Sequence, residues 1–129
     1  MNWLDNALNT HSTAVLLRGK RAEILAANLA NSDTPGYKAR DMDFKNVFNQ
    51  MKTGELAAPV SSHRRHFNFS NAASLETTYR TPTKESTDGN TVVREVEQAA
   101  FTENSIKYLA SLRFLSGSIR GIMLALRGE

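Results

Sequence analysis

The chain has 129 residues, which is enough for one domain but not comfortably for two. Its 16 Lys and Arg against 13 Asp and Glu leave a net charge of +3 without a long basic run, which disfavours a nucleic-acid-binding protein. The absence of cysteine excludes disulfides, thiol catalysis and thiolate metal sites.

The N-terminal part predicts one long helix over residues 3–30. Its seam positions recur at alternating four- and three-residue intervals, close to a heptad pattern. They are Leu4, Leu8, His11, Val15, Arg18, Ala22, Leu25 and Leu29. The segment lacks the features of a secretory signal peptide, and no run of 18 apolar residues predicts a membrane span.

The stretch AANLANSDTPGYKARDMDF follows as residues 26–44 and predicts a defined helix exit. Its Asn, Ser, Asp and Thr side chains compete with helical hydrogen bonds, and Pro35 disfavours helix at Thr34. Pro35 and Gly36 fit the central pair of a type II turn, which needs positive φ at Gly36. We expect Tyr37 to pack its ring back on the helix end.

Two aromatic residues four apart, Phe44 and Phe48, follow this stretch. On a helical turn they would share one face, as the anchors of a docking segment do. The alternative is a short amphipathic helix that packs on the chain's own surface.

The middle of the chain, residues 38–90, is rich in Ser, Thr and Asn and has only short apolar runs. We expect it to be largely irregular and unable to form a core alone. The weakly alternating HFNFS run allows a short strand or hairpin near residues 66–80.

The C-terminal part predicts a second long helix over about 93–127. Its seam is Phe101, Ser105, Tyr108, Leu112, Leu115, Ile119, Ile122 and Leu126. Ile106, Leu109, Met123 and Leu124 lie off this seam, so the apolar surface is wider than a two-stranded contact needs.

These elements predict a mainly α fold in which the terminal helices pair like a coiled coil around an irregular middle. We divide the chain into residues 1–37, 38–90 and 91–129. Because one helix hairpin cannot cover both apolar stripes, the surplus should meet other copies or other proteins. The expected assembly interface is Leu4, Leu8, Val15, Ala22, Leu25, Leu29, Phe101, Tyr108, Leu112, Leu115, Ile119, Ile122 and Leu126. The alternative is a small monomeric bundle with the middle folded over it.

The segment from Ala26 to Phe44 resembles the signature of the bacterial flagellar axial proteins, which form the rod, hook and hook–filament junction. The resemblance rests on Asn28, Leu29, Ala30, Asn31, Thr34, Pro35, Gly36 and Tyr37. YKARDMDF, DGNTV at residues 88–92 and FTENSIKY are similar to the small proximal rod subunits of that family. The family usually has Asp where Val93 stands, so we expect Asn90 or Thr91 to cap the C-terminal helix.

The resemblance implies a structural subunit of the proximal rod, with no enzymatic activity, no cofactor and no metal. Such subunits leave the cytoplasm through the flagellar type III export apparatus without a cleaved signal, and they assemble helically in the basal body, within the periplasmic space. The implied partners are other copies, the rod proteins FlgC, FlgF and FlgG, FliE at the MS-ring junction, and the export gate. Phe44 and Phe48 match the family's export motif, and the rod would transmit torque from the MS ring.

No other residues form a convincing catalytic or metal site. His63 and His66 flank two arginines that would repel a cation, and no third ligand is evident. Asp41 and Asp43 lack a partner base and are interpreted as surface charges.

The remaining candidates are interpreted as contacts between subunits. His11 is expected to be packed or pH-sensitive in an interface. Trp3 would lie at a subunit interface, and Arg18, Lys20 and Arg21 would pair with neighbouring chains. Rival functions are an amphipathic membrane-surface protein, a helical adaptor and a nucleic-acid-binding module.

Overall fold

The computed structural model describes residues 3–53, 77–82 and 87–128, with the side chains of the first helix described from residue 8 onward. Within these ranges the elements are α1 (Trp3–Ala30), β1 (Arg40–Asp41), α2 (Phe44–Thr53), β2 (Thr78–Tyr79) and α3 (Arg94–Arg127). The two long helices predicted from the sequence are confirmed to within one residue.

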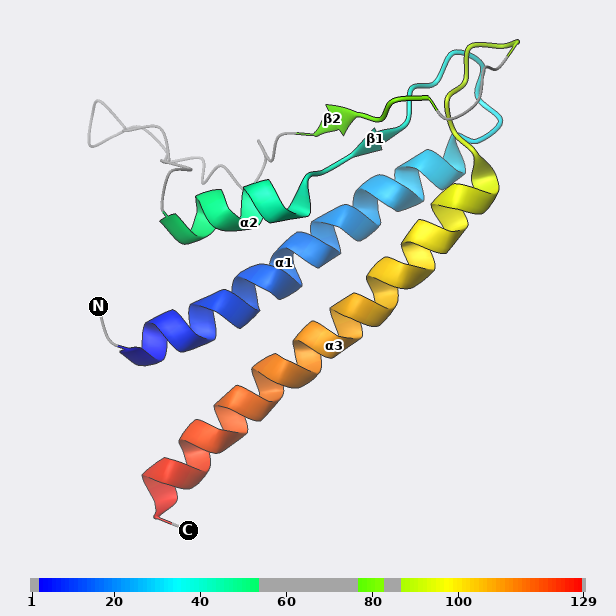
Figure 1. The fold of residues 1–129 in the computed structure, drawn as a ribbon. Coiled ribbons are helices and arrows are strands. Elements are labelled where there is room, and N and C mark those ends of the chain that lie inside the picture. The colour runs from blue at the N-terminus through cyan, green and yellow to red at the C-terminus, as the bar shows by residue number, and fades with distance from the viewer. Residues whose placement is uncertain (1–2, 54–76, 83–86, 129) are drawn as a thin grey trace, which may run out of the picture.

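The two long helices form an antiparallel hairpin (Figure 1). α1 has 28 residues and α3 has 34, which correspond to about 42 and 51 Å at 1.5 Å per residue. The two chain ends lie at one end of this hairpin, and the connecting turns lie at the other. This confirms the mainly α fold with paired terminal helices.

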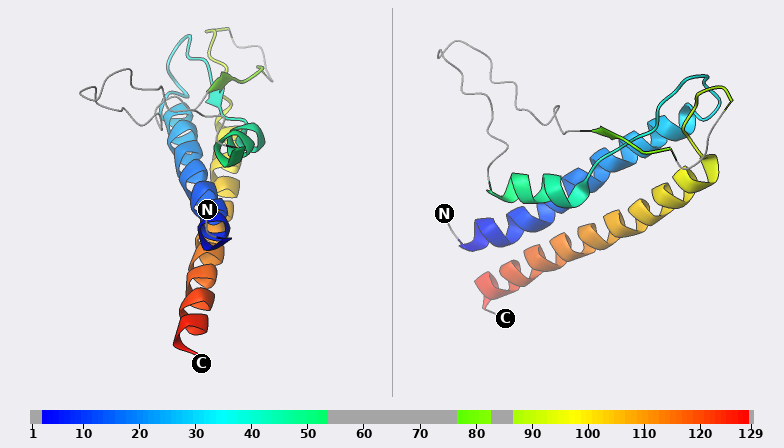
Figure 2. Two further views of the ribbon diagram at one scale, coloured as in Figure 1. Left: turned by 90° about the vertical axis from the view of Figure 1, so that its left-hand side faces the viewer. Right: turned by 45° about the horizontal axis from the view of Figure 1, so that its top comes forward.

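α2 lies along α1 on the side away from α3, so α1 is the central helix of the three (Figure 2). The apolar core of the described residues is small and lies between α1 and α2. Leu17, Met42 and Val47 are buried there, and Ile24, Phe44, Phe48 and Met51 pack against them. The middle segment therefore completes a core with α1.

The two short strands pair antiparallel, with Arg40 opposite Tyr79 and Asp41 opposite Thr78. The strand expected near residues 66–80 is confirmed at Thr78–Tyr79. Its partner is the segment after the signature turn, not a neighbouring part of the middle segment as a local hairpin would require. Residues 66–76 of that expectation lie outside the described residues.

Candidate assembly interface

The chain leaves α1 through the turn that the sequence predicted. Tyr37 N–H donates to the Thr34 carbonyl at 3.3 Å, and Gly36 has φ of 72°, as a type II turn requires at its third position. The Tyr37 hydroxyl donates to Asn28 Oδ1 at 3.4 Å, so the side chain does turn back to the helix.

A second turn, at residues 88–91, docks on the first and leads into α3. Gly36 N–H donates to the Asp88 carbonyl at 3.0 Å, and Thr91 N–H donates to the Tyr37 carbonyl at 3.0 Å. The Asn90 amide nitrogen lies 2.8–3.1 Å from the carbonyl oxygens of residues 31, 32 and 34 and donates to them. The signature stretch is therefore both the exit of α1 and the seat of the turn before α3.

The expectation that Asn90 or Thr91 caps α3 is wrong. Asn90 instead satisfies carbonyls just beyond the C-terminal end of α1, where helical partners run out. Thr91 Oγ1 accepts from the Ala39 N–H at 2.8 Å. The residue at the cap position of α3 is Val93, whose side chain makes no capping hydrogen bond.

Asn28 connects the three segments that meet near the end of α1. Its side chain is fully buried, and its amide group donates to the Arg40 carbonyl at 2.7 Å and to Glu97 at 3.0 Å. Its Oδ1 accepts from the Arg40 N–H at 3.1 Å and from Tyr37. A single polar side chain thus fixes α1, β1 and α3 relative to one another.

A charged cluster beside Asn28 joins α1, β1 and α3 with Arg80, which follows β2. Asp41 on β1 accepts hydrogen bonds from Arg21 at 3.0 Å and from Arg80 at 2.7 Å, and Arg80 also pairs with Glu97 on α3. Glu97 is 1% exposed. Burial alone would raise the pKa of Asp41, but the hydrogen bonds from Arg21, the Met42 amide and Arg80 lower it below the ordinary value of 3.8.

This cluster corrects one sequence-based interpretation. Asp41 is not a surface charge, because it is half-buried between two arginines; Asp43 is exposed and accepts from the Asn46 N–H at 3.1 Å at the start of α2. Within the chain, Arg21 pairs with Asp41 and Lys20 pairs with Glu23, each at 3.0 Å, and their pairing with neighbouring chains stays a prediction.

The contact between α1 and α3 is polar along its centre. Glu97, Asn104 and Ser111 are buried at seven-residue intervals on α3. Asn104 donates to the Arg18 carbonyl at 2.9 Å, and Arg18 Nε donates to the Ser111 hydroxyl at 3.1 Å, so Arg18 also finds its partner within the chain. The side of α3 that faces α1 therefore carries hydrogen-bonding residues where a self-sufficient hairpin would carry leucines.

His11 also contacts α3. Its ring stacks on Phe114 with ring centroids 6.2 Å apart. The packed histidine expected from the sequence is thus found inside the chain's own hairpin.

Large apolar side chains of α3 lie on the surface instead. The exposed fractions are 80% for Leu126, 64% for Ile106 and Phe114, and 58% for Leu109. Leu112, Ile119, Met123 and Leu124 are exposed as well. Because α1 and α2 leave much of these side chains uncovered, α3 presents an apolar surface of the kind that marks assembly sites.

The residues expected at an assembly interface divide by burial. Leu25 is buried, whereas Leu112, Ile119 and Leu126 are exposed. The side chain of Leu4 lies outside the described part. The others are half-buried along the hairpin: Leu8, Val15, Ala22, Leu29, Phe101, Tyr108, Leu115 and Ile122.

Comparison with known proteins identifies the family. The family described as "Flagella basal body rod protein" matches residues 8–38, which contain most of α1 and the signature turn. The flagellar basal body rod protein FlgB of Cereibacter sphaeroides is 40% identical over 131 residues, covering both chains completely. The chain belongs to the FlgB family of flagellar basal body rod proteins. The FlgB proteins of Aeromonas hydrophila and Salmonella typhimurium are 39% and 40% identical, each over 97% of this chain and 96% of the relative.

Membership of the FlgB family makes this chain a structural component of the flagellar basal body rod rather than an enzyme. The resemblance inferred from the signature stretch is thereby confirmed. The polar hairpin and exposed apolar helix are features of a subunit that works as part of a larger structure.

The aromatic pair of α2 lies against the chain's own core. The rings of Phe44 and Phe48 stack with centroids 5.8 Å apart, and the Arg18 guanidinium lies 4.5 Å from the Phe44 ring centroid. Both rings pack beside Val47. The two aromatic residues do share one face of a helix, as the sequence indicated.

By length and composition alone, α3 could cross a membrane, which the sequence did not lead us to expect. Arg113 and Arg120 interrupt its apolar sequence. The proposed interpretations of His63 and His66, and of the Trp3 side chain, fall on parts that the structure does not describe.

Three buried residues of the site were not predicted from the sequence: Glu97, Asn104 and Ser111. Glu97, Asn104 and Ser111 had a detectable signal, because they recur at heptad spacing beside Phe101 and Tyr108. Because these residues are polar, a pattern of apolar seam positions does not include them.

Proposed function

We propose that this chain is a subunit of the proximal part of the rod, and that it assembles helically with copies of itself and with the rod proteins FlgC, FlgF and FlgG. FliE and the MS-ring junction would lie at its base, and the assembly would transmit torque from that ring. It would occupy the periplasmic part of the basal body.

The observation that carries this proposal is the distribution of polar and apolar residues on α3. Hydrogen-bonding residues face α1 at positions 97, 104 and 111, while Leu109, Leu112, Ile119 and Leu126 are exposed. Burying a leucine contributes about 1.5–3 kcal/mol, so leaving several exposed is costly unless neighbouring subunits cover them. A helical rod supplies such neighbours along the whole length of α3.

The two ends of the hairpin suit different tasks in such an assembly. Four segments are locked together near the turns by Asn28, Asp41, Arg80 and Glu97. The opposite end, where both termini lie (Figure 1), includes the exposed apolar residues Met123, Leu124 and Leu126 of α3. One end would hold α1 and α3 at a fixed angle, and the other end would bind neighbouring subunits. Together they would give a defined helical assembly.

We further propose that the chain is exported by the flagellar type III apparatus without a cleaved signal, with Phe44 and Phe48 as the segment that docks on the export gate. Their stacked arrangement on α2 supports a paired anchor. In the folded chain the pair is partly covered by α1. Docking would therefore precede folding, or would require α2 to leave α1.

The test is a clean deletion of the gene, followed by electron microscopy of basal bodies and a secretion assay in the same cells. In the deletion strain we expect rings without a rod and a loss of secretion. The unchanged chain should restore both the rod and secretion. Complete basal bodies and filaments in the deletion strain would reject the proposed place in the rod. Normal secretion without a rod would separate the structural role from any role in export.

The apolar composition of α3 gives one specific reason to test a second function, binding at a membrane surface. Arg113, Arg120 and Arg127 recur at seven-residue intervals, and no acidic residue lies between Asn104 and Gly128. Flotation of the purified chain with anionic lipid vesicles would test it. Binding that weakens with salt is expected for a membrane-surface protein and not for a rod subunit alone.

A further inference from the structure

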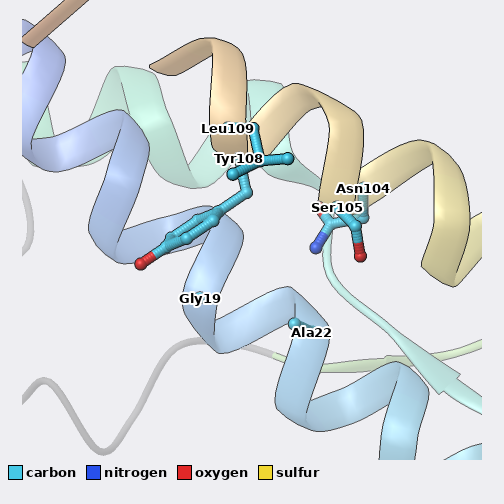
Figure 3. A pocket seen from close by; sticks show the side chains of 6 residues that line it. All are labelled: Gly19, Ala22, Asn104, Ser105, Tyr108 and Leu109. Carbon is cyan, nitrogen blue, oxygen red and sulfur yellow. The ribbon is translucent and has the colours of Figure 1, made fainter. Parts of the chain in front are cut away.

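A groove between the two long helices is lined by residues of both. It has a volume of about 270 Å³ and is lined by Gly19, Ala22, Asn104, Ser105, Tyr108 and Leu109 (Figure 3). Small residues of α1 form one side, and the Tyr108 ring and Leu109 form the other. The lining is mostly apolar, which suits an apolar side chain as occupant.

The glycine in this groove has no explanation within the described chain. Glycine in a helix interior costs about 1 kcal/mol relative to alanine. A Cβ built on Gly19 would meet no atom within 4 Å among the described residues. The chain's own packing could therefore accept alanine there, so the open backbone suits the close approach of another molecule.

Asn104 is a second and independent indication of an occupant. Its side chain is 1% exposed and donates to the Arg18 carbonyl at 2.9 Å. Its Oδ1, by contrast, is buried and accepts no hydrogen bond from any group that the structure describes. A buried acceptor without a donor is destabilising by about 1–3 kcal/mol, so a donor brought by an occupant would be favoured once the Asn104 side chain turns its oxygen toward the groove.

The same chain carries a row of side chains that fits such a groove. Ile119, Met123 and Leu126 recur on one face of α3 and are 43%, 46% and 80% exposed. Arg120 and Arg127 lie beside this row, and their guanidinium groups have no ion-pair partner among the described residues. The row thus combines apolar side chains, which suit Leu109, with hydrogen-bond donors, which Asn104 Oδ1 lacks.

We propose that the groove around Gly19 is the docking site for the C-terminal row Ile119–Met123–Leu126 of a second copy of this chain. This inference rests on the proposed helical assembly and names the contact that builds it. Groove and row occupy different parts of the molecule, so each copy can offer its row to the groove of the next in a head-to-tail contact. Where the rotation between successive copies does not close a ring, such contacts generate an open helical filament.

The first experiment compares Gly19→Ala with Ser12→Ala. Both substitutions favour α1, but Ser12 is exposed outside the groove and bonds only the Asn9 carbonyl of its own helix. We expect Gly19→Ala to raise the melting temperature of the isolated chain by about 4 °C and to abolish rods in cells. Ser12→Ala should leave rods intact. Normal rods with Gly19→Ala, or a loss of rods accompanied by a lower melting temperature, would overturn the proposal.

The second experiment identifies the occupant by disulfide cross-linking. The natural chain has no cysteine, so introduced thiols react without background. Cells would co-produce copies carrying Ala22→Cys and copies carrying Leu126→Cys, with each single variant as a control. An oxidised adduct of two copies in purified basal bodies is the expected result.

An adduct with a different protein, or none in basal bodies that contain both variants, would overturn docking between copies and leave the rod function standing. If the unchanged chain were absent from purified rods, the proposed function would fail instead. A motility assay of each single variant shows beforehand that the cysteines are tolerated.

Discussion

At the scale of single residues, the signature stretch works through side chains that hold other segments. Asn28 saturates its donors and acceptor with groups from β1, the signature turn and α3. Asn90 does the same for the carbonyls of the turn. This explains why the stretch contains more polar residues than a turn needs: several of them bond segments that meet at the end of α1 and not only the turn itself.

Asn28→Ala is predicted to destabilise the isolated chain by about 3 kcal/mol, because it removes one of two partners of the buried Glu97 carboxylate and both side-chain bonds to the backbone of Arg40. Asn31→Ala is the matched control, because Asn31 makes its side-chain bonds at the exposed surface. It should cost less than about 1 kcal/mol. Urea denaturation followed by circular dichroism measures both, and equal losses would contradict the role given to Asn28.

The Asp41 cluster predicts a pH dependence. Because the pKa of Asp41 is lower in the folded chain than its ordinary value of 3.8, the unfolded chain takes up a proton first as pH falls. The stabilisation is complete above the ordinary value and is lost as pH falls toward the folded-state pKa. Arg21 and Arg80 face Asp41, and Glu97 lies behind Arg80.

Asp41→Asn should therefore lower stability at pH 7 and flatten the decline of stability between about pH 5 and pH 2. Asp33→Asn is the control, because Asp33 is exposed and pairs with Arg94 at the surface. Denaturation curves at several pH values provide the measurement. A slope that stays the same in Asp41→Asn would show that other carboxylates control the acid response.

At the scale of elements, each helix has a different relation to its neighbours. α1 is covered on two sides, by α2 through an apolar core and by α3 through polar contacts. α3 is covered on one side only and exposes much of its apolar surface. α2 depends on α1 for its burial, since Val47 and its apolar neighbours pack with Leu17 and Ile24 of α1. α3 therefore packs on α1 along its length and still leaves apolar surface for further partners to cover.

α2 also allows the export proposal to be separated from folding. Phe44→Ala together with Phe48→Ala should reduce secretion several-fold, because both anchors of the docking segment are lost. Val47→Ala is the matched control: it removes buried apolar volume from the same helix and should destabilise by about 1–2 kcal/mol while leaving the aromatic pair in place. Equal secretion by all variants would remove Phe44 and Phe48 as an export motif.

At the scale of the whole molecule, periodicity predicted both long helices, and side-chain chemistry predicted the turn at Gly36, because these features depend on local residues. The pairing of β1 with β2 could not be predicted from the sequence, since it joins residues about 40 positions apart. The burial of Asp41 and Glu97 could not be predicted either, because their arginine partners come from other parts of the chain. Sequence reasoning also assigned apolar residues to the hairpin seam, whereas Asn104 and Ser111 lie there because they bond Arg18.

That arrangement gives the last prediction. Leu112 is 36% exposed on α3, so the chain covers it only in part, and Leu112→Asp should lower the melting temperature of the isolated chain without unfolding it. In the rod the same carboxylate would be buried against a neighbour without a partner, which costs far more than assembly can offset. Basal bodies from cells with Leu112→Asp should therefore lack the rod.

Thr102→Asp is the control, because Thr102 is exposed on the same helix but outside its apolar surface, and its hydroxyl bonds the Gln98 carbonyl. It adds the same charge and should permit rods. If Leu112→Asp cells swim normally, the apolar surface of α3 is not covered in the assembled rod, and the exposed leucines need another partner. If both variants block assembly, the added charge on α3, rather than its position in a buried contact, is what the rod cannot accept.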